Sequence, residues 1–478
     1  MNTKKSSKDC ALKKIKHILV VGLGKSGLSG INYLTKQIEF KKKLFKVSVY
    51  DKNKSIKEQK GLLKNLDIED FFTGDIKFEF LNGKSHIFLS PGVNPKEVKK
   101  FGHELNIIND ISLFLEHLSC SSSNLKVIGV TGTNGKTTTC LFLEHLLLKA
   151  GYKTKALGNL GIPPLDLIND LEDIDVLVLE VSSFQLNPFS KNGLPGGKID
   201  VGIFLNFTED HLDMHDNMDD YLQSKITLLK SSIRQVVNSN LLKILPQRFA
   251  DITFKHEEDK NIETQIPNEI SKREYIVQSI KNSKFIVDNK GFEVNIDDSN
   301  LIGMHNELNI AAAFAAFRCL DLSFIKYQDA IMSFKGVPHR LEWVRDIDGI
   351  KFYNDSKATN AASTVAALEF LKNKNIFLIV GGDSKKLSME PLKKYVTKNV
   401  SQLLLIGKDA LIFKKLFKNL SKLKISMCND LNHAVSEAFN HAHSGDIILL
   451  SPACSSHDMY KNYIDRGEHF KKIVHALR

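Results

Sequence analysis

The sequence has no C-x-x-C pair and no compact group of cysteines, because its six cysteines are scattered along the chain. Structural zinc sites and the disulfide frameworks of small secreted proteins both depend on closely spaced cysteines, so this spacing argues against either. Reduced thiols in a cytosolic protein are the expectation that remains. The positions are Cys10, Cys120, Cys140, Cys319, Cys428 and Cys454.

Long apolar segments are also missing. No run of about eighteen or more apolar residues occurs, which argues against a membrane-spanning helix. The basic N-terminus, MNTKKSSKDCALKKIK, resembles the charged part of a signal peptide. However, the apolar run that follows, ILVVGLG, is short and broken by glycine, and no cleavage site of small residues comes after it. We therefore expect a cytoplasmic protein.

Basic residues do not gather in one stretch. The formal net charge is +11, but the lysines are spread through the whole chain. This distribution favours a solvated surface that attracts anionic metabolites over a nucleic-acid interface. No internal repeat of a fixed short period is present. We expect a monomer that binds no nucleic acid.

What is present is the alternation of strand and helix patterns that is typical of parallel α/β sheets. With 478 residues the chain is long enough for about three domains. We place them at residues 1–120, 121–336 and 337–478, the second beginning near the serine-rich CSSSN. The expected fold is α/β, with Rossmann-like N-terminal and C-terminal domains and a central P-loop domain whose sheet is mostly parallel. Within the polar stretch 241–300, FIVDNKGFEVNI is typical of a hairpin.

The segment Val127–Thr139, VIGVTGTNGKTTT, is typical of a strand, a phosphate-binding loop and a helix. We expect Lys136 to meet the β- and γ-phosphates of ATP and Thr137 to bind Mg²⁺. The segment departs from G-x-x-x-x-G-K-[ST], because Val130 stands where the first glycine belongs and Gly129 lies one residue too early. The phosphate-binding residues would be Gly132, Thr133, Asn134, Gly135, Lys136, Thr137 and Thr138.

Acids and histidines follow two further strand patterns. Glu180 ends VLVLE, where a carboxylate could bind magnesium directly or through water. In NFTEDHLDMH, residues His211 and His215 are four apart, so a helix would place both on one face, as in a zinc pair. No glutamate lies between them, so a magnesium-associated role or a solvated acidic helix start fits better than a zinc hydrolase. Lys225, in YLQSK, is by its pattern a surface lysine.

Gly22, Gly24 and Gly27 form G-x-G-x-x-G between a strand and a helix. Three interpretations stay open: NAD binding, binding of another nucleotide diphosphate, and close packing of the helix on the strand. Asp51, which closes the next strand, could accept a hydrogen bond from a ribose or a base. Few proteins need both NAD and a P-loop, so the P-loop weakens the NAD interpretation.

Polar residues also begin helices in the last third of the chain. Asn306 and Asn309 share a helix face in GMHNELN, where contact with adenine or ribose and helix capping are both open. Arg340 in VPHRLE is either a phosphate clamp or a surface residue. In YNDSKATN capping explains one or two polar residues but hardly Asp355 and Lys357 together, so this segment favours a functional role.

These motifs together resemble the Mur ligases of peptidoglycan synthesis. The matching segments run in order along nearly the whole chain: TGTNGKTTT, LEVSSFQ, NFTEDHLDMH, GMHNELN, VPHR, NDSKATN and SPACSS. GLGKSG, NDSKATN and SPACSSHDMYKNY are most similar to the members that add D-glutamate. The resemblance implies a ligase that uses ATP and Mg²⁺ to join D-glutamate to UDP-N-acetylmuramoyl-L-alanine through an acyl phosphate. Its three domains would bind the UDP sugar, ATP and the amino acid.

The resemblance also implies roles for individual residues. Lys225 would be carbamylated and would hold magnesium together with Thr137, Glu180 and His211. The residues with a catalytic role would be Lys136, Glu180, His211, Lys225 and Lys357. Contacts to the UDP sugar would come from Gly24, Lys25, Ser26, Asp51, Ser90, Gly92, Asn159, Ser182, Ser183 and Gln185. Contacts to the nucleotide would come from Asn306, Asn309, Arg340 and Asp355. Contacts to D-glutamate would come from Lys357, Thr359, Lys385, Ser456 and Tyr463.

Some positions depart from the family's usual pattern. Met214 stands where many members have arginine, His457 where leucine is frequent, and Tyr463 where phenylalanine is frequent. GGDSKKLSM lacks the acidic-aromatic pair that often follows the lysine. The last three departures surround the expected amino-acid pocket, so they bear on its contacts more than on the chemistry.

Two competing functions are weaker. The same ligation with another amino acid or a folate acceptor conflicts with the uridine-type front domain and with NDSKATN. A non-enzymatic nucleotide switch, or an ATPase that binds nucleic acid, would have clustered basic residues and no group of acids and lysines in the third block. The sequence shows the opposite on both points.

Overall fold

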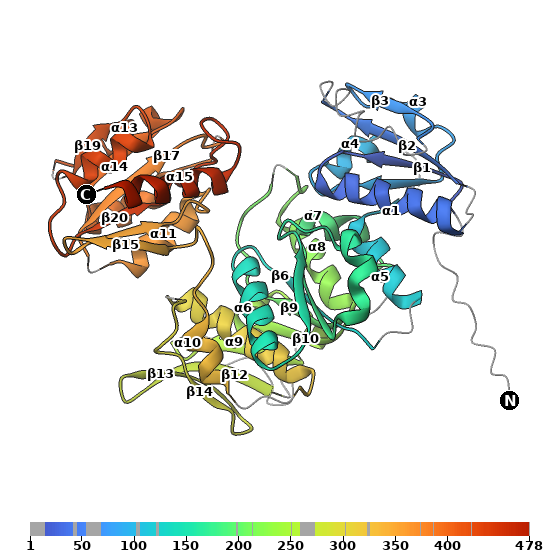
Figure 1. Ribbon diagram of the computed structural model, residues 1–478, viewed down its shortest axis with the longest axis horizontal. Helices are drawn as coiled ribbons and strands as arrows, with labels where there is room; N and C mark the ends of the chain where they lie inside the picture. Colours follow the sequence, from blue (N-terminus) through green and yellow to red (C-terminus); the bar gives the residue numbers. More distant parts are fainter. Residues whose placement is uncertain are drawn as a thin grey trace. The chain divides into compact units, whose positions relative to one another are not determined.

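The computed structural model describes residues 15–477 except 42–44, 54–67, 102–105, 121–123, 197–198, 213, 250, 259–272, 302, 323–325, 373, 386 and 422. It divides into two compact units, one up to Phe334 and one from Lys335 on (Figure 1). Most of the expected serine-rich linker, CSSSN, lies outside the described residues.

The first sheet of the unit that ends at Phe334 is wholly parallel, with strand order β3-β2-β1-β4-β5 among the described residues. Its central strands are buried apolar runs, as expected for a sheet covered on both faces. The Rossmann-like prediction is confirmed in this respect. The strands are β1 (His17–Val21), β2 (Lys46–Asp51), β3 (Phe71–Thr73), β4 (His86–Leu89) and β5 (Asn106–Ile108). The helices are α1 (Lys25–Lys41), α3 (Phe78–Leu81), α4 (Pro95–Lys99) and α5 (Asp110–Cys120).

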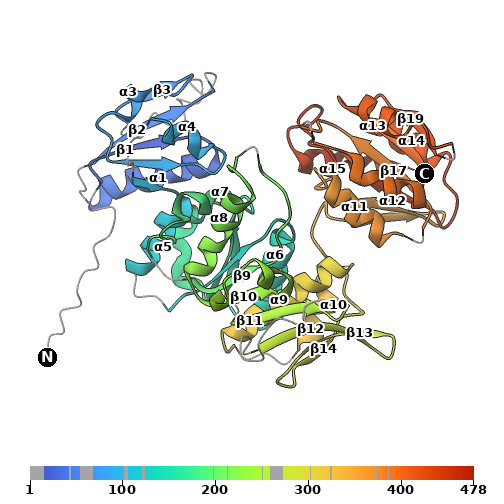
Figure 2. The same ribbon diagram turned by 180° about the vertical axis from the view of Figure 1, so that it is seen from behind.

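The second sheet of this unit has the order β14-β13-β12-β11-β10-β9-β6-β8-β7 in the described part of the chain. The seven strands from β12 to β7 in this order run parallel to one another, β13 is antiparallel to β12, and β13 and β14 form the predicted hairpin at the edge (Figure 2). The mostly parallel sheet is therefore confirmed. The strands are β6 (Lys126–Thr131), β7 (Thr154–Gly158), β8 (Val176–Glu180), β9 (Ile199–Phe204), β10 (Ser232–Asn238), β11 (Ile252–His256), β12 (Arg273–Ile280), β13 (Ser283–Asp288) and β14 (Glu293–Asn295).

Helices cover both faces of this second sheet. α6 and α9 pack against each other on one face, and α8 lies against the other (Figure 1). The two sheets of the unit share one apolar cluster, which includes Ile18, Phe114, Leu177 and Leu228. A continuous core of this kind fixes one sheet relative to the other. The helices are α6 (Lys136–Lys149), α7 (Ser183–Leu186), α8 (Met218–Lys230), α9 (Met304–Cys319) and α10 (Tyr327–Ser333), with the 3₁₀ segments η3 (Pro164–Asp173), η4 (Asn187–Phe189), η5 (Ser239–Lys243) and η6 (Gln247–Phe249).

The unit from Lys335 on contains a third sheet, with order β15-β16-β20-β17-β18-β19 among the described strands. Among the strands that the structure describes here, only β15 runs antiparallel to its neighbour, and apolar clusters cover both faces of the sheet. The strands are β15 (Glu342–Ile347), β16 (Ile350–Asn354), β17 (Ile376–Gly381), β18 (Val400–Ile406), β19 (Lys424–Met427) and β20 (Ile447–Leu450). The helices are α11 (Ala361–Phe370), α12 (Lys393–Asn399), α13 (Ala410–Phe417), α14 (Leu431–Phe439) and α15 (Tyr463–Ala476), with the 3₁₀ turn η8 (Glu390–Leu392).

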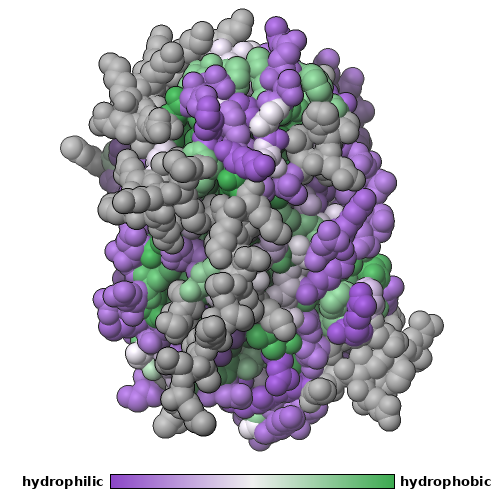
Figure 3. All heavy atoms as spheres, turned by 90° about the vertical axis from the view of Figure 1, so that its right-hand side faces the viewer, coloured by the Kyte–Doolittle hydropathy of each residue, from purple (hydrophilic) through white to green (hydrophobic). Residues whose placement is uncertain are grey.

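On the face drawn in Figure 3, hydrophilic residues are interspersed with small areas of hydrophobic ones. This pattern is ordinary for the surface of a folded domain. None of the helices that the structure describes combines the length and the apolar character needed to cross a membrane.

Candidate active site

A cavity of about 370 Å³ lies at the carboxyl ends of the first sheet's strands and reaches the second sheet. Ligands bind at this edge of open α/β sheets. The structure brings eight of the ten residues expected to contact the UDP sugar into the lining of this cavity, and the other two, Ser182 and Ser183, begin α7 beside Gln185. The lining residues are Gly22, Gly24, Lys25, Ser26, Asp51, Ser90, Pro91, Gly92, Val93, Gly158, Asn159, Gly161, Pro163 and Gln185.

The three glycines of G-x-G-x-x-G serve different needs. Gly22 has φ +89°, and its carbonyl accepts a hydrogen bond from the Ser90 hydroxyl at 2.6 Å. A Cβ on Gly27 would lie 1.9 Å from the Gly22 carbonyl oxygen, so Gly27 allows the close packing of α1. A Cβ on Gly24 would meet no atom of the described residues within 4 Å. Of these three glycines, Gly24 is therefore the one whose missing side chain leaves open space, and it lines the cavity.

A buried carboxyl, Asp110, joins the two walls of this cavity. It accepts hydrogen bonds from the Ser26 hydroxyl at 2.9 Å and from the Gln185 amide at 3.1 and 3.2 Å. Burial raises the pKa of Asp110 above its usual value. Gln185 also closes a capping box with Ser182 at the start of α7. Sequence reasoning missed Asp110, because its partner Gln185 is 75 residues away; only the S-x-x-Q spacing of the capping box could be read locally.

The phosphate-binding loop has the expected geometry. Gly135 precedes α6 with φ +83°, a left-handed conformation that glycine adopts without strain. The Lys136 ammonium donates to the carbonyls of Gly132 and Thr133 at 2.7 and 2.8 Å. The side chain of Asn206, after β9, accepts from the Asn134 amide at 2.8 Å and so braces the loop. Backbone amides at the start of a helix favour a bound phosphate.

Glu180 lies next to this loop at the carboxyl end of β8. Its two carboxylate oxygens accept hydrogen bonds from the Thr137 hydroxyl at 2.8 Å and from the Asn159 amide at 2.9 Å. Glu180 is buried. The carboxylate thus connects the phosphate-binding loop to Asn159, which lines the cavity.

The interpretation of Lys225 as a surface lysine is wrong. Its side chain is buried on α8, and its Nζ atom lies 2.8 Å from the Gly132 carbonyl oxygen and 4.5 Å from the centre of the Tyr221 ring. Burial, and next the positive charge of Lys136, hold the pKa of Lys225 well below its usual range. A lysine in this setting carries a neutral, nucleophilic amine at a higher population than a solvated one.

His211 and His215 do not have the helical spacing of a zinc pair, an interpretation that the sequence already disfavoured. The described residues between β9 and Met218 contain no helix, and His211 has φ +56°. The two ring nitrogens of His215 are both engaged, Nδ1 with the Asp220 carboxylate and Nε2 with the Ser183 hydroxyl, each at 3.0 Å. The rings of both histidines pack against Phe184.

Asn306 and Asn309 lie together at the start of α9, with the Asn309 amide donating to the Asn306 side-chain oxygen at 3.1 Å. A Cβ on Gly135 would lie 2.3 Å from the side-chain oxygen of Asn309. The start of α9 therefore lies directly against the phosphate-binding loop. Neither asparagine caps the helix, because the cap residue is Gly303.

In the unit from Lys335 on, three adjacent strands bring two expected residues, Asp355 and Lys385, to one sheet edge together with Ser451, for which the sequence predicted no role. Asp355 follows β16, Ser451 follows β20, and Lys385 follows β17. The Asp355 carboxyl accepts from the Leu341 amide at 3.1 Å and from the Ser451 hydroxyl at 2.7 Å. Burial raises the pKa of Asp355 to about 7, against the pull of the nearby charges of Arg340 and Arg466.

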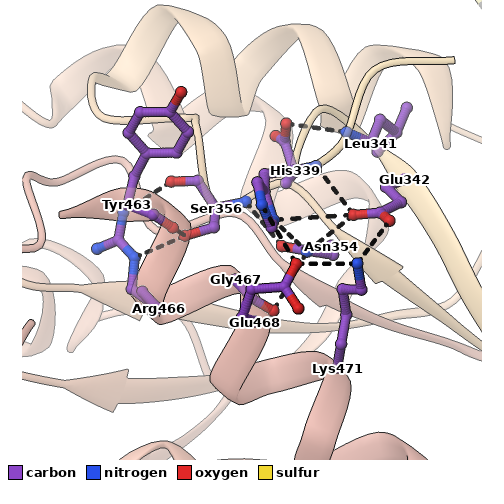
Figure 4. Close-up of polar contacts among 11 residues, drawn as sticks. His339, Leu341, Glu342, Asn354, Ser356, Tyr463, Arg466, Gly467, Glu468 and Lys471 are labelled. Carbon is purple, nitrogen blue, oxygen red and sulfur yellow. Dashed lines mark hydrogen bonds and ion pairs between the residues drawn. The ribbon is translucent and has the colours of Figure 1, made fainter. Parts of the chain in front are cut away.

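Lys357 and Tyr463 are in contact, with the lysine Nζ atom 3.9 Å from the ring centre. Tyr463 begins α15, and its carbonyl accepts from the Ser356 hydroxyl at 2.8 Å. The buried Arg466 donates to the hydroxyl and carbonyl of Ser356 (Figure 4), which holds α15 against the loop after β16. Of the remaining expected residues, Ser456 is buried, Arg340 and Thr359 are half-buried, and Lys385 is exposed.

His339 precedes Arg340 in the VPHRLE motif, and the sequence predicts no role for it. Its ring lies beside the backbone of Gly467, where a Cβ would come within 2.2 Å of Nδ1. Nδ1 also accepts a hydrogen bond from the Asn354 amide at 2.9 Å (Figure 4). Burial lowers the pKa of His339 below its usual value. His339 therefore positions the segment that carries Arg340 against β16 and α15.

Comparison with protein families matches three successive parts of the chain. Residues 16–100 match the Mur ligase MurD-like N-terminal domain, residues 130–317 the Mur ligase middle domain, and residues 339–454 the Mur ligase glutamate ligase domain. Among curated proteins, the UDP-N-acetylmuramoylalanine–D-glutamate ligase of Methylobacillus flagellatus is 32% identical, over 97% of this chain and 98% of its own. The ligase of the same name from Clostridium botulinum is 34% identical, over 97% of each chain.

Solved structures show the same fold at low identity. MurF ligase from Thermotoga maritima in complex with ADP superposes with a TM-score of 0.56 at 18% identity, covering 98% of this chain and 97% of its own. UDP-N-acetylmuramate-alanine ligase MurC from Thermotoga maritima superposes with a TM-score of 0.55 at 17% identity, covering 97% and 99%. Since three family domains follow one another in order and curated relatives match over nearly their full length, the chain belongs to the Mur ligase family.

Proposed function

We propose that this protein is an ATP-dependent ligase that adds D-glutamate to UDP-N-acetylmuramoyl-L-alanine in cytoplasmic peptidoglycan precursor synthesis. The observation that carries the proposal is the meeting of Lys136, Lys225 and the Glu180–Thr137 pair at the phosphate-binding loop. The cavity lined by glycines lies in the same unit as this loop. Its lining includes Asn159, whose amide donates a hydrogen bond to Glu180. The names of the curated relatives supply the substrates.

The proposed reaction first joins two anions. The carboxylate of the alanyl group attacks the γ-phosphorus of ATP, an O–P bond forms, and ADP leaves. Lys136 would neutralise negative charge at this step, and because its ammonium already lies at the loop, little reorganisation is needed. The product is an acyl phosphate.

The amine of D-glutamate then attacks the acyl carbon. A C–N bond forms, phosphate leaves through a tetrahedral intermediate, and the nitrogen loses a proton. We assign Lys357, Thr359, Lys385, Ser456 and Tyr463 to the binding of D-glutamate. The two lysines would form ion pairs with its two carboxylates, and these ion pairs would orient its amine. We assign Asn306, Asn309, Arg340 and Asp355 to the nucleotide.

The residues beside the loop fit a magnesium site. The Glu180 carboxylate and the Thr137 hydroxyl lie 2.8 Å apart, and oxygen atoms of this kind are the ligands that Mg²⁺ prefers. We propose that these two residues, His211 and a carbamate on Lys225 hold the metal. When bound, magnesium would supply positive charge to the phosphates. The lowered pKa of Lys225 supports the carbamate, because CO₂ reacts with the neutral amine.

We further propose that residues 1–120, 121–336 and 337–478 form the UDP-sugar, ATP and amino-acid domains, and that the protein acts as a monomer. Size-exclusion chromatography with light scattering tests the oligomeric state. A dimer mass at micromolar concentration would contradict that part of the proposal.

The central test measures phosphate release with ATP, magnesium, UDP-N-acetylmuramoyl-L-alanine and a panel of amino acids. We expect turnover with D-glutamate and little with L-glutamate or lysine. Turnover with L-glutamate or lysine but not with D-glutamate would contradict the proposed specificity and would leave the proposed ligase chemistry standing.

A further inference from the structure

Ser183, His215 and Asp220 form a continuous hydrogen-bonded chain between α7 and α8. The His215 Nε2 atom lies 3.0 Å from the Ser183 hydroxyl oxygen, and Nδ1 lies 3.0 Å from a carboxylate oxygen of Asp220. Ser183 and His215 are both buried. The proposed reaction described above gives no role to His215 or Asp220.

The Asp220 carboxylate determines which atom of His215 carries the proton. Because an ionised carboxylate only accepts hydrogen bonds, Nδ1 must donate, and Nε2 of the neutral ring is then an acceptor. Asp220 also accepts from the Asn187 side-chain amide at 3.2 Å and the Asp216 backbone amide at 3.3 Å, so it is held in place from two further sides. The tautomer of His215 is thus fixed by the structure.

This tautomer fixes the direction of the Ser183 hydroxyl. With Nε2 as the acceptor, the hydroxyl proton of Ser183 points to His215, and both lone pairs of its oxygen remain available to accept. Ser183 lies on the turn between Glu180, which contacts the phosphate-binding loop, and Gln185, which lines the cavity. The same loop after β9 that carries His215 also carries His211, whose ring packs against Phe184.

We propose that His215 and Asp220 are positioning residues that hold the Ser183 hydroxyl as a hydrogen-bond acceptor for the amide N–H of the alanyl group of the UDP-sugar substrate. This N–H is adjacent to the carboxylate that attacks ATP, so a fixed acceptor would orient that carboxylate. The inference rests on the proposed function, because it takes its substrate from it. It also links α8, which carries Lys225, to α7 through one chain of polar contacts.

The test is a double-mutant cycle on the full chain. Ser183→Ala and Asp220→Asn should each lower kcat/KM for UDP-N-acetylmuramoyl-L-alanine about tenfold, the size of one lost hydrogen bond in a substrate site. Asp220→Asn acts indirectly, because its amide donates to Nδ1 and turns Nε2 into a donor, as in the altered tautomer known for other Ser-His-Asp arrangements. Since both changes remove the same acceptor, the double variant should be no worse than Ser183→Ala alone.

The matched control is Asp219→Asn, which removes the neighbouring carboxylate from the same turn of α8. Asp219 is exposed and lies 3.5 Å from Gln223, so this variant should keep the kcat/KM of the unmodified chain. His215→Gln, whose amide can still donate to Asp220 and accept from Ser183, should retain more activity than His215→Phe. KM for ATP should change less than twofold in all of them.

The possible outcomes distinguish the positioning role of His215 and Asp220 from the proposed ligase function. Effects that multiply in the double variant, or a rise in KM for ATP equal to that for the UDP sugar, would overturn the positioning role and leave the ligase assignment standing. Equal losses of activity in His215→Gln and His215→Phe would also overturn the positioning role and leave the ligase assignment standing. Absence of turnover by the unmodified chain with D-glutamate would overturn the proposed function and this inference with it.

Discussion

The ammonium groups of Lys136 and Lys225 both point to one atom, the carbonyl oxygen of Gly132, at 2.7 and 2.8 Å. Two lysines from different helices, α6 and α8, thus meet at the phosphate-binding loop. Like charges this close disfavour full protonation of both, and Lys225 is the more deeply buried partner. The arrangement keeps one fixed cation at the loop and leaves the second lysine open to chemical modification.

We expect Lys136→Ala to lower kcat for ligation at least about a hundredfold, because it removes a fixed cation from the site where charge develops. Binding of the UDP sugar, measured by calorimetry, should change little, since the cavity does not include Lys136. Lys149→Ala, an exposed lysine at the end of the same helix, is the matched control and should be fully active. Loss of UDP-sugar binding in Lys136→Ala would contradict the division of roles between the two sites.

Carbamylation of Lys225 can be observed directly. In buffer with ¹³C-bicarbonate, the protein should show a carbamate carbon signal by NMR, because the lowered pKa of Lys225 increases the share of its amine that is neutral and reactive. The signal should be missing in Lys225→Arg, whose guanidinium does not form a carbamate under these conditions. Activity of the unmodified protein should fall when CO₂ is removed and return when bicarbonate is added. An unchanged carbon spectrum in Lys225→Arg would show that the signal comes from another amine.

Gly135→Ala should damage nucleotide binding beyond the cost of its backbone conformation. The new methyl group would lie 2.3 Å from the Asn309 side-chain oxygen and would displace this amide, which we assign to the nucleotide. We expect the Kd for ATP to rise at least about tenfold and the melting temperature to fall, as for a steric change in a packed site.

Gly151→Ala serves as its control. Gly151 has φ +86°, close to the +83° of Gly135, but a Cβ there would meet none of the described atoms within 4 Å. This variant should therefore lose only about 1 kcal/mol of folding stability, the cost of placing a residue with a Cβ in a left-handed conformation, and should bind ATP normally. Equal effects of the two substitutions on ATP binding would mean that contact with Asn309 is unimportant.

Asp355 should make the stability of the unit from Lys335 on depend on pH. Its pKa is about 7 in the folded chain, above the usual 3.8, so the folded state binds this proton more tightly than the unfolded state. The stabilisation from that proton is complete below about pH 4 and is lost as the pH rises through about 7, and it amounts to at most about 4 kcal/mol.

Asp355→Asn imitates the protonated carboxyl and should remove this dependence. Thermal unfolding without nucleotide, followed from about pH 5 to about pH 8, should show a melting temperature that falls with pH in the unmodified chain and falls less in the variant. Parallel curves for the two proteins would show that Asp355 is already ionised at the lower pH.

Much of the fold and the site could be predicted from local patterns. The buried strands before Gly22, Lys136 and Asp355 were recognisable as apolar runs, and each ends in polar residues that the parallel arrangement brings to a sheet edge. The glycine spacing of the phosphate-binding loop likewise determined its left-handed turn at Gly135. These features depend on residues a few positions apart, so the sequence contains them fully.

The tertiary structure decided what depends on distant partners. Lys225 is typical of a surface lysine in its own segment, but its burial comes from packing against a loop 93 residues earlier. The sequence did not reveal the partners of His215, which are Ser183 and Asp220, one at each ring nitrogen. Asp110 had no recognisable role until folding placed it between Ser26 and Gln185. Burial and hydrogen-bond partnership are properties of the packed chain, and they determine the charge state of a lysine, a histidine or an aspartate that the residue type leaves open.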